Sequence, residues 1–410
     1  MQNWEQTYPF SIGGPVTIEQ MSGPVRVAGW DRPEIMVRAT ADEGEPLSER
    51  LAVYAGEDRF HLKVKSLRSG FLGLFQFETA VRLEIMVPFQ TACDVQSGSG
   101  SVEVLSTRAP LHIETGSGSV SVTDVGDVDL ETGSGHVAVR TVNGSAEIET
   151  GSGSIEVEQV AGAASVETGS GRVVARYIGQ GLQVSTGSGS LAVSDVTGQV
   201  DLETGSGSTQ VERVTGPGLT LDSGGGSARL AAIDVAQLNI EASSGGVDVE
   251  LLRIYPGGTY EIETGSGGVV IKLPADASLD LELETDSGKI VYTGLPLRVH
   301  HQEAGELEGT MGAGGATLSV EAGSGGIVIR PGAAAGQPEA QYARVASAPQ
   351  APKSPMPPAA AALEQAMAKD AALESSESMK RVLNMVAEGK LSPEEAEQIL
   401  RALDEEETPR

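Results

Sequence analysis

A short pattern of an apolar residue, a carboxylate, a threonine and Gly-Ser-Gly recurs along the chain at a nearly constant interval. It reads IETGSGSVSV from Ile113, and close copies follow from LETGSGHVAV onward. The step between copies is 17 to 19 residues at first, then 22 and 21, and a last gap of 37 predicts one degenerate unit near Leu307 to Met311. The opening apolar residues are Val95, Ile113, Leu130, Ile148, Val166, Val184, Leu202, Leu221, Ile240, Ile262, Leu283 and Val320. A repeat of this kind limits the possible folds to stacked arrays of one small unit.

Within each unit, apolar and polar residues alternate. Ile113 and Thr115 share one face of the chain, as do Val120 and Val122 after the glycines. A period of two is typical of a strand, whereas the glycines and β-branched residues disfavour a helix. Each unit therefore predicts a strand, a Gly-Ser-Gly turn, a second strand and a softer turn such as Thr123-Asp124.

One such unit is too small to bury its own apolar face, so the units must stack on one another. Parallel strands would then repeat every ~4.8 Å along the stack. The glycines fit this arrangement, because every turn needs a positive φ that only glycine adopts freely. The predicted fold is all-β, a parallel β-solenoid of coils of about 18 residues, and the general preference for right-handed crossovers favours a right-handed β-helix.

The sequence divides into four parts. Residues 1–94 contain strand-like alternation without the Gly-Ser-Gly signature, which predicts a β cap or irregular opening coils that cover the end of the array. Residues 95–330 form the repeat array. Residues 331–362 are rich in Ala and Pro, which predicts a disordered linker, and residues 363–410 return to a helical period.

The C-terminal part predicts two short helices. Gly389 is placed to end the first, and Ser392-Pro393 to begin the second. Such a small helical hairpin needs a partner to be stable, so we expect it to bind another protein or a second copy of the chain. The residues expected to carry this association are Met379, Val382, Leu383, Val386, Ile399, Leu400 and Leu403.

The formal net charge of −29 and the pI near 4.5 exclude a nucleic-acid-binding role that depends on a basic stripe. Attraction to anionic membranes is disfavoured for the same reason. A large negative charge is commonly a means of solubility, and binding of a basic partner is the alternative. The single cysteine, Cys93, cannot form an internal disulfide and is expected to be a buried, small apolar residue.

The N-terminal MQNWEQTYPF does not resemble a secretory signal, and no apolar stretch is long enough to cross a membrane. We therefore expect a cytoplasmic protein without direct membrane insertion, with the cell surface as the alternative.

The carboxylates that follow the apolar positions predict an outward-facing column, with one side chain per coil. Neighbours ~5 Å apart would repel by roughly 1 kcal/mol in water, and solvent and salt absorb that repulsion. A Ca²⁺-binding strip is the alternative, but calcium β-rolls place an Asp inside the glycine turn and only Asp286 approaches that pattern. The column comprises Glu114, Glu131, Glu149, Glu167, Glu203, Asp222, Glu241, Glu263, Glu284 and Glu321, with Ser185 in one coil.

Other chemistry is not expected. Polysaccharide-cleaving β-helices need acids clustered with Arg or Lys, and aromatic residues for sugars, whereas both are sparse here. Adjacent His300 and His301 would point in opposite directions on a strand, which disfavours a shared metal. The repeated Ser and Thr hydroxyls are expected to form hydrogen-bonded ladders along the coils. We thus predict no catalytic residue, no cofactor and no metal ligand.

The IETGSGSV and LETGSGHV units, with GPVRVAGWD at residues 23–31 and Val87-Pro88, resemble the bacterial family DUF4097, often labelled as candidate adhesins. The resemblance covers roughly residues 10–330 and implies no defined catalytic residues. The segment MKRVLNMVAEGKLSPEEAEQILRAL (379–403) is similar to SHOCT-like helical hairpins. That second resemblance implies oligomerisation or regulation in envelope-stress processes.

These observations favour a non-enzymatic scaffold, a β-solenoid rod with a helical docking module. An adhesin or glycan-binding surface protein is the alternative, and a polysaccharide-active enzyme is the least favoured.

Overall fold

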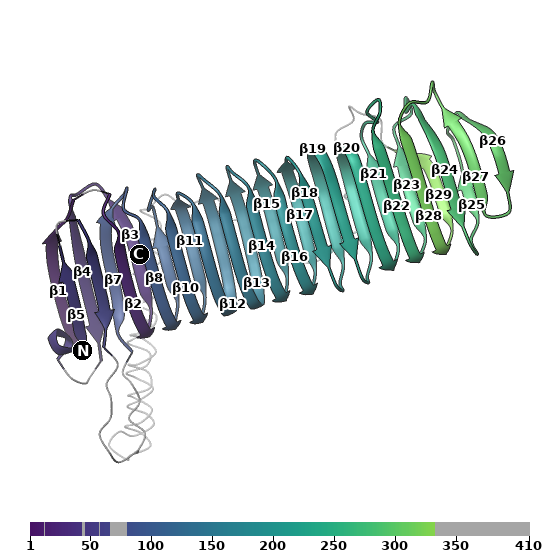
Figure 1. Cartoon of the computed structure of the whole chain (residues 1–410). Coiled ribbons are helices and arrows are strands. Elements are labelled where there is room, and N and C mark those ends of the chain that lie inside the picture. The colour runs from purple at the N-terminus through teal and green to yellow at the C-terminus, as the bar shows by residue number, and fades with distance from the viewer. Residues whose placement is uncertain (12, 43–45, 57, 66–79, 333–410) are drawn as a thin grey trace, which may run out of the picture. The chain divides into compact units, whose positions relative to one another are not determined.

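The computed structural model describes residues 1–11, 13–42, 46–56, 58–65 and 80–332. These residues form an all-β parallel solenoid, as predicted, with a single helical turn, α1 (Leu47–Arg50). Figure 1 shows the strands lying side by side along the stack. The linker and the predicted helical hairpin lie outside the described residues.

Each complete coil contributes two strands, which build two opposed lines of strands. The first line, which precedes the Gly-Ser-Gly corner, contains β2 (Val16–Ser22), β6 (Phe60–Val64), β8 (Cys93–Ser99), β10 (Leu111–Ser117), β14 (Ala164–Ser170), β16 (Leu182–Ser188), β18 (Val200–Thr204), β22 (Thr259–Ser266), β24 (Leu279–Thr285) and β28 (Thr317–Ser324). The second line contains β3 (Val25–Trp30), β7 (Arg82–Pro88), β9 (Val102–Leu105), β11 (Val120–Val125), β15 (Val173–Ile178), β17 (Leu191–Thr197), β21 (Val247–Leu251), β23 (Val269–Leu273), β25 (Ile290–Tyr292) and β29 (Ile327–Pro331).

Four long strands belong to both lines, because their backbone pairing continues around a corner. β12 (Val128–Val142) and β13 (Ala146–Val160) run through the Gly-Ser-Gly corner, whereas β19 (Thr209–Ser223) and β20 (Ala228–Ser244) run through the opposite turn. The remaining strands, β1 (Gln2–Pro9), β4 (Glu34–Ala41), β5 (Leu51–Ala55), β26 (Leu297–Glu303) and β27 (Glu306–Met311), pair antiparallel near the two ends.

Like residues stack on like residues in the core. Ile113 pairs in register with Leu130, which pairs with Ile148, and all three side chains are fully buried. Cys93 belongs to a neighbouring inward column and is buried with a free thiol, as predicted. Its burial raises the pKa of the thiol to about 12.

The Gly-Ser-Gly corner requires both glycines for steric reasons. The second glycine of each corner has a positive φ, for example +135° at Gly171. A Cβ on Gly171 would lie 1.7 Å from the carbonyl oxygen of Gly153 in the adjacent coil. A Cβ on the first glycine of a corner, Gly151, would lie 2.7 Å from the oxygen of Gly133. The two glycines recur because consecutive corners approach each other too closely for a Cβ at either glycine position.

The motif threonine satisfies a carbonyl group at the same corner. Its buried hydroxyl donates to the carbonyl oxygen two residues later, at 3.3 Å for Thr150 and Ser152 and at 3.2 Å for Thr168 and Ser170. The predicted ladders between coils are therefore wrong for these threonines. The hydroxyl uses the second lone pair of this carbonyl, because equivalent corner carbonyls, such as that of Ser188, already accept a backbone N–H from the adjacent coil.

In eight consecutive coils, the turn opposite the Gly-Ser-Gly corner contains one left-handed residue that is not glycine. Their φ values lie between 53° and 59°, and they include Thr141 at 56°. Such a conformation costs roughly 1–2 kcal/mol for an L-residue with a Cβ. The column comprises Ser106, Asp124, Thr141, Gln159, Tyr177, Asp195, Arg213 and Ala232.

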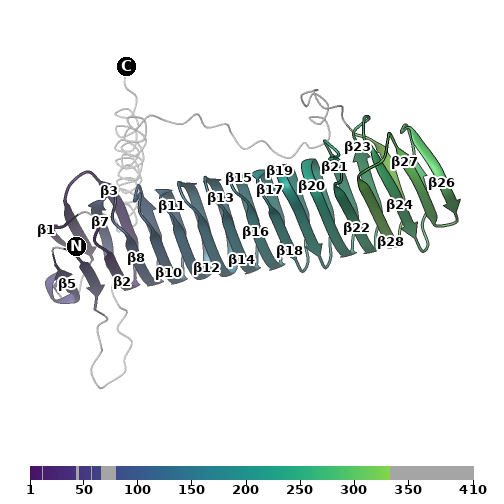
Figure 2. The same cartoon turned by 45° about the horizontal axis from the view of Figure 1, so that its top comes forward.

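The coils near residue 300 do not stack in sequence order. Val320 of β28 lies between Ile262 of β22 and Leu283 of β24, in parallel register with both. The degenerate parallel unit predicted near Leu307 to Met311 is wrong, because β27 there pairs antiparallel with β24 and β26. The 37-residue gap holds this hairpin, which places β26 at the end of the stack (Figure 2).

The other end is built in a similar way. β2 lies between β6 and β8 in parallel register with both, and β3 lies between β7 and β9. Antiparallel β4 and β1 then follow β7. Both ends therefore finish in antiparallel strands.

Candidate interaction surface

The predicted carboxylate column exists and is longer than the sequence indicated. Cα register links the outward residues of the first line of strands from Glu19 to Glu303 across consecutive strands. Gln96 and Ser185 take two positions. The thirteen carboxylates of this inner acidic row are Glu19, Glu114, Glu131, Glu149, Glu167, Glu203, Asp222, Glu241, Glu263, Glu321, Glu284, Glu306 and Glu303, all exposed except the half-buried Glu19.

Three members of this row were missed by the sequence reasoning. Glu19 follows Ile18 in an opening coil, and the Ser22-Gly23 pair after it was the available signal. Glu303 and Glu306 join the row through antiparallel pairing at the end hairpin, which no repeat spacing indicates.

A second row of outward residues lies two positions earlier on the same parallel strands, and two positions later on the antiparallel β27. Its seven carboxylates, the outer acidic row, are Asp94, Asp129, Glu147, Asp201, Glu261, Glu282 and Glu308. We call the two rows together the acidic face. Within the described strands, its cationic or titratable basic members are Lys63, His61, His112 and His301.

These basic groups are already engaged by neighbouring carboxylates. Glu19 accepts hydrogen bonds from Lys63 and pairs with His61 at 2.8 Å. The pKa of Glu19 is lowered, first because Lys63 donates to its carboxylate. His112 Nδ1 lies 3.0 Å from Asp129. Most of the acidic face therefore keeps a negative charge with no cation beside it.

The expectation that the two neighbouring histidines point in opposite directions is wrong, because a β-bulge between Val299 and His301 interrupts the alternation and both side chains contact the outward face of β27. His300 Nε2 lies 2.8 Å from the Thr310 hydroxyl, whereas His301 Nε2 lies 3.7 Å from Glu303 and 3.8 Å from Glu306. The ligand atoms of His301, Glu303 and Glu306 lie within 4.8 Å of one another, and all three residues are exposed. Sequence spacing could not assemble this group, because Glu306 comes from the facing strand.

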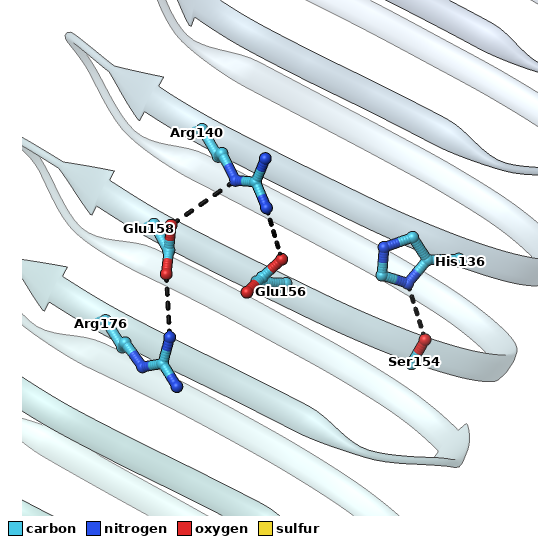
Figure 3. Close-up of polar contacts among 6 residues, drawn as sticks. All are labelled: His136, Arg140, Ser154, Glu156, Glu158 and Arg176. Carbon is cyan, nitrogen blue, oxygen red and sulfur yellow. Dashed lines mark hydrogen bonds and ion pairs between the residues drawn. The ribbon is translucent and has the colours of Figure 1, made fainter. Parts of the chain in front are cut away.

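The second line of strands has a different charge pattern. Arg140 lies 2.8 Å from Glu156 and 3.5 Å from Glu158, and Arg176 lies 3.0 Å from Glu158 (Figure 3). Lys272 lies 2.7 Å from Asp248 on the same surface. We call this surface the paired face, because its basic residues alternate with its acids. Its outward basic residues are Arg26, Arg82, Arg140, Arg176, Arg229, Lys272 and Arg330.

The acidic face carries a shallow groove of about 480 Å³. Glu114, Glu131, Glu149 and Glu167 line it, with the threonines and first glycines of their coils. A smaller hollow of about 240 Å³ has Glu263, Glu284, Asp286 and Glu321 around it. Chemically, these surfaces offer repeated carboxylate oxygens, which suit recognition of positive charge.

The predicted association residues Met379, Val382, Leu383, Val386, Ile399, Leu400 and Leu403 lie outside the described residues. None of the helices in the described part of the chain has the length and apolar character that crossing a bilayer requires.

Two solved structures that match this chain over most of its length are bacterial proteins. A candidate cell adhesion protein from Clostridium sporogenes is 10% identical, with 81% of this chain and 100% of that chain covered and a TM-score of 0.17. A candidate adhesin from Bacteroides fragilis is 8% identical, with 80% and 97% covered and a TM-score of 0.27. At these values neither protein contributes to the functional argument. The search of curated proteins found no match.

Two family profiles match the sequence. The SHOCT-like domain profile matches residues 377–408. The Toastrack DUF4097 profile matches residues 14–181 and 179–330, which include the whole parallel stack. The chain therefore belongs to the Toastrack DUF4097 family.

Proposed function

We propose that this protein is a non-enzymatic scaffold whose acidic face binds a polycationic partner. The observation that carries the proposal is the asymmetry between the two surfaces of the solenoid. Twenty carboxylates face one way with few basic neighbours, whereas the acids of the paired face are matched by Arg and Lys.

The backbone makes this charge pattern an organised surface. Each carboxylate except Glu303, which lies on the end strand β26, is attached to a strand that pairs with both neighbours, so the repeat of ~4.8 Å is set by backbone hydrogen bonds. Mutual repulsion of roughly 1 kcal/mol per neighbouring pair at ~5 Å in water opposes the stacking. A bound polycation removes that repulsion and needs no reorganisation of the scaffold, and the field of the row speeds its approach.

We further propose that the SHOCT-like segment supplies association with a second copy or a protein partner. The support is its profile match together with the helical spacing of Leu383, Leu400 and Leu403. Leu400→Asp should lower the mass of the full chain in sedimentation. An unchanged mass would remove the idea of self-association.

The charge proposal is tested with two triple variants of equal charge change. E131Q/E149Q/E167Q neutralises neighbouring coils of the acidic face, and E103Q/E156Q/E212Q removes three carboxylates from the paired face. Binding of fluorescent poly-L-lysine to the full chain is measured by anisotropy at low and high salt, with poly-L-glutamate as the negative probe. We expect the first variant to weaken poly-L-lysine binding about three- to tenfold and the second less than twofold. Equal losses would show that only net charge matters and would overturn the proposal.

A further inference from the structure

We infer that an apolar groove beside the acidic face is a docking site for an amphipathic helix of a protein partner. The helix would present a stripe of apolar side chains with Lys or Arg along one side. This inference rests on the proposed function, and it adds the place and the kind of partner.

The groove follows the turn that enters each first-line strand. It encloses about 700 Å³ and extends over successive coils from Pro15 to Asp201. Its floor is mostly apolar and includes Ala92, Pro110 and Ala163, while Asp127, Ser145 and Gln199 take the same stacked position in other coils. Ala146 and Ala164 lie in the inward column that holds Leu111 and Leu182 in neighbouring coils, so small side chains deepen the middle of the groove.

One wall of the groove is the outer acidic row. Asp94, Asp129, Glu147 and Asp201 all line it, and Asp127 adds a fifth carboxylate at the turn. His112 is the basic side chain among the described lining residues, and it already contacts Asp129 at 3.0 Å. On the far side, the turns Asn143-Gly144 and Ala161-Gly162 carry no charge, whereas the equivalent turn of an earlier coil carries Arg108. A ligand that fits both features is apolar along its centre and positive along one edge.

The groove is wide enough to hold side chains of a partner but too narrow to hold the partner's backbone as well. Eight stacked positions, from Pro15 to Gln199, span ~34 Å at the strand spacing. The volume divided by that length leaves a cross-section of ~20 Å², far less than a helix about 10 Å across. The groove therefore admits one line of side chains from a partner that lies along it, and about 22 residues of helix would match its length.

Backbone hydrogen bonding selects the helix over an extended segment. The strands below the groove, such as β10 and β14, pair with neighbours on both sides. An extended peptide would find no free strand edge there, and most of its own N–H and C=O groups would face apolar side chains, with polar groups at only a few floor positions such as Asp127 and Ser145. A helix satisfies its backbone internally and can bury an apolar ridge in the groove.

The test uses the full chain and three designed 22-residue peptides of equal length. The first has a leucine stripe with lysines along one flank, the second has the same stripe with glutamates, and the third has the same lysines without the stripe. We expect the first peptide to bind at least tenfold more tightly than either of the others in anisotropy. Binding of the stripeless peptide with equal affinity would overturn the inference.

Two substitutions then locate the site. Ala163→Trp fills the groove at an exposed position, and Ala161→Trp in the same turn lies outside its lining and is the matched control. We expect A163W to weaken the first peptide at least tenfold and A161W less than twofold. As a second test, the isosteric D129N/E147Q should weaken the peptide more than E131Q/E149Q, which removes equal charge from the inner row of the same coils.

The outcomes separate this inference from the proposed function. In one outcome, poly-L-lysine binding depends on the inner acidic row, but peptide binding is insensitive to A163W and D129N/E147Q. That outcome overturns the groove as the docking site and leaves the proposed function of the acidic face intact. Loss of charge dependence in both assays overturns the proposed function itself.

Discussion

Replacing Gly171 by alanine should damage the solenoid far more than the small size of a methyl group suggests. Gly171 has φ of +135°, and its new Cβ would lie 1.7 Å from the Gly153 oxygen and 2.7 Å from the Gly153 carbonyl carbon. The unfavourable dihedral costs of order 1–3 kcal/mol. Relief of the clash requires the two corners to separate, and comparable overpacking typically costs a further 1–3 kcal/mol. We expect a total loss of roughly 2–6 kcal/mol.

The control is Gly315→Ala, because Gly315 has φ of +105° but nothing within 4 Å of the added Cβ. The loss of stability in this variant measures the cost of the unfavourable dihedral angle without a steric clash. Urea unfolding followed by circular dichroism measures both variants, and hydrogen exchange on the 153–189 region shows whether the loss is local, as expected for a repeat array. If Gly171→Ala destabilises the protein no more than Gly315→Ala does, the close approach of the corners is not what demands glycine.

Two further predictions concern the opposite turn and the core. Thr141→Asn should stabilise the protein by about 1 kcal/mol in urea unfolding, because asparagine tolerates the left-handed region better than a β-branched residue does. Thr123→Asn, one residue before the equivalent turn position, should give no gain, and equal effects would contradict the strain argument. The Cys93 thiol should react with a thiol reagent at pH 8 only after unfolding. Since burial raises its pKa to about 12, the stability it contributes is complete below the unfolded pKa near 8.5 and is lost as the pH rises towards 12. Cys93→Ser should therefore lose less stability than the parent between pH 8.5 and pH 10, and parallel curves would refute this.

The stack could be predicted from the sequence because each coil repeats the same pattern of apolar residues and corner glycines. The spacing of Ile113, Leu130 and Ile148 alone predicts parallel register, and the corner glycines predict the turn. The ends could not be predicted in this way. Val320 lies between Ile262 and Leu283 because strand order there depends on pairing between segments distant in sequence, which no local periodicity records.

The charge asymmetry shows the same division. The carboxylate before each threonine was visible as a column, and its outward direction followed from alternation. The outer acidic row adds seven more carboxylates to the same surface. This could not be predicted from the sequence, because it depends on which residues share a line of strands. The positions of the corners determine which surface a residue belongs to. Glu147 lies on the acidic face with Glu149 of β13, whereas Glu156 of the same strand lies beyond the corner, near Arg140 on the paired face.

Solubility alone does not account for this distribution. Repulsion between copies of the protein depends on net charge, and carboxylates on either surface would supply it equally. The arginines of the paired face contact Glu156 and Glu158, so that surface already tolerates charge of both signs. Similar pairing would relieve the repulsion within the inner acidic row, yet the four consecutive positions of that row from Glu114 to Glu167 are all glutamates. A surface that retains repulsion it could relieve supports the proposed polycationic ligand, and the comparison of poly-L-lysine binding by the variants with neutralised acidic and paired faces tests that proposal.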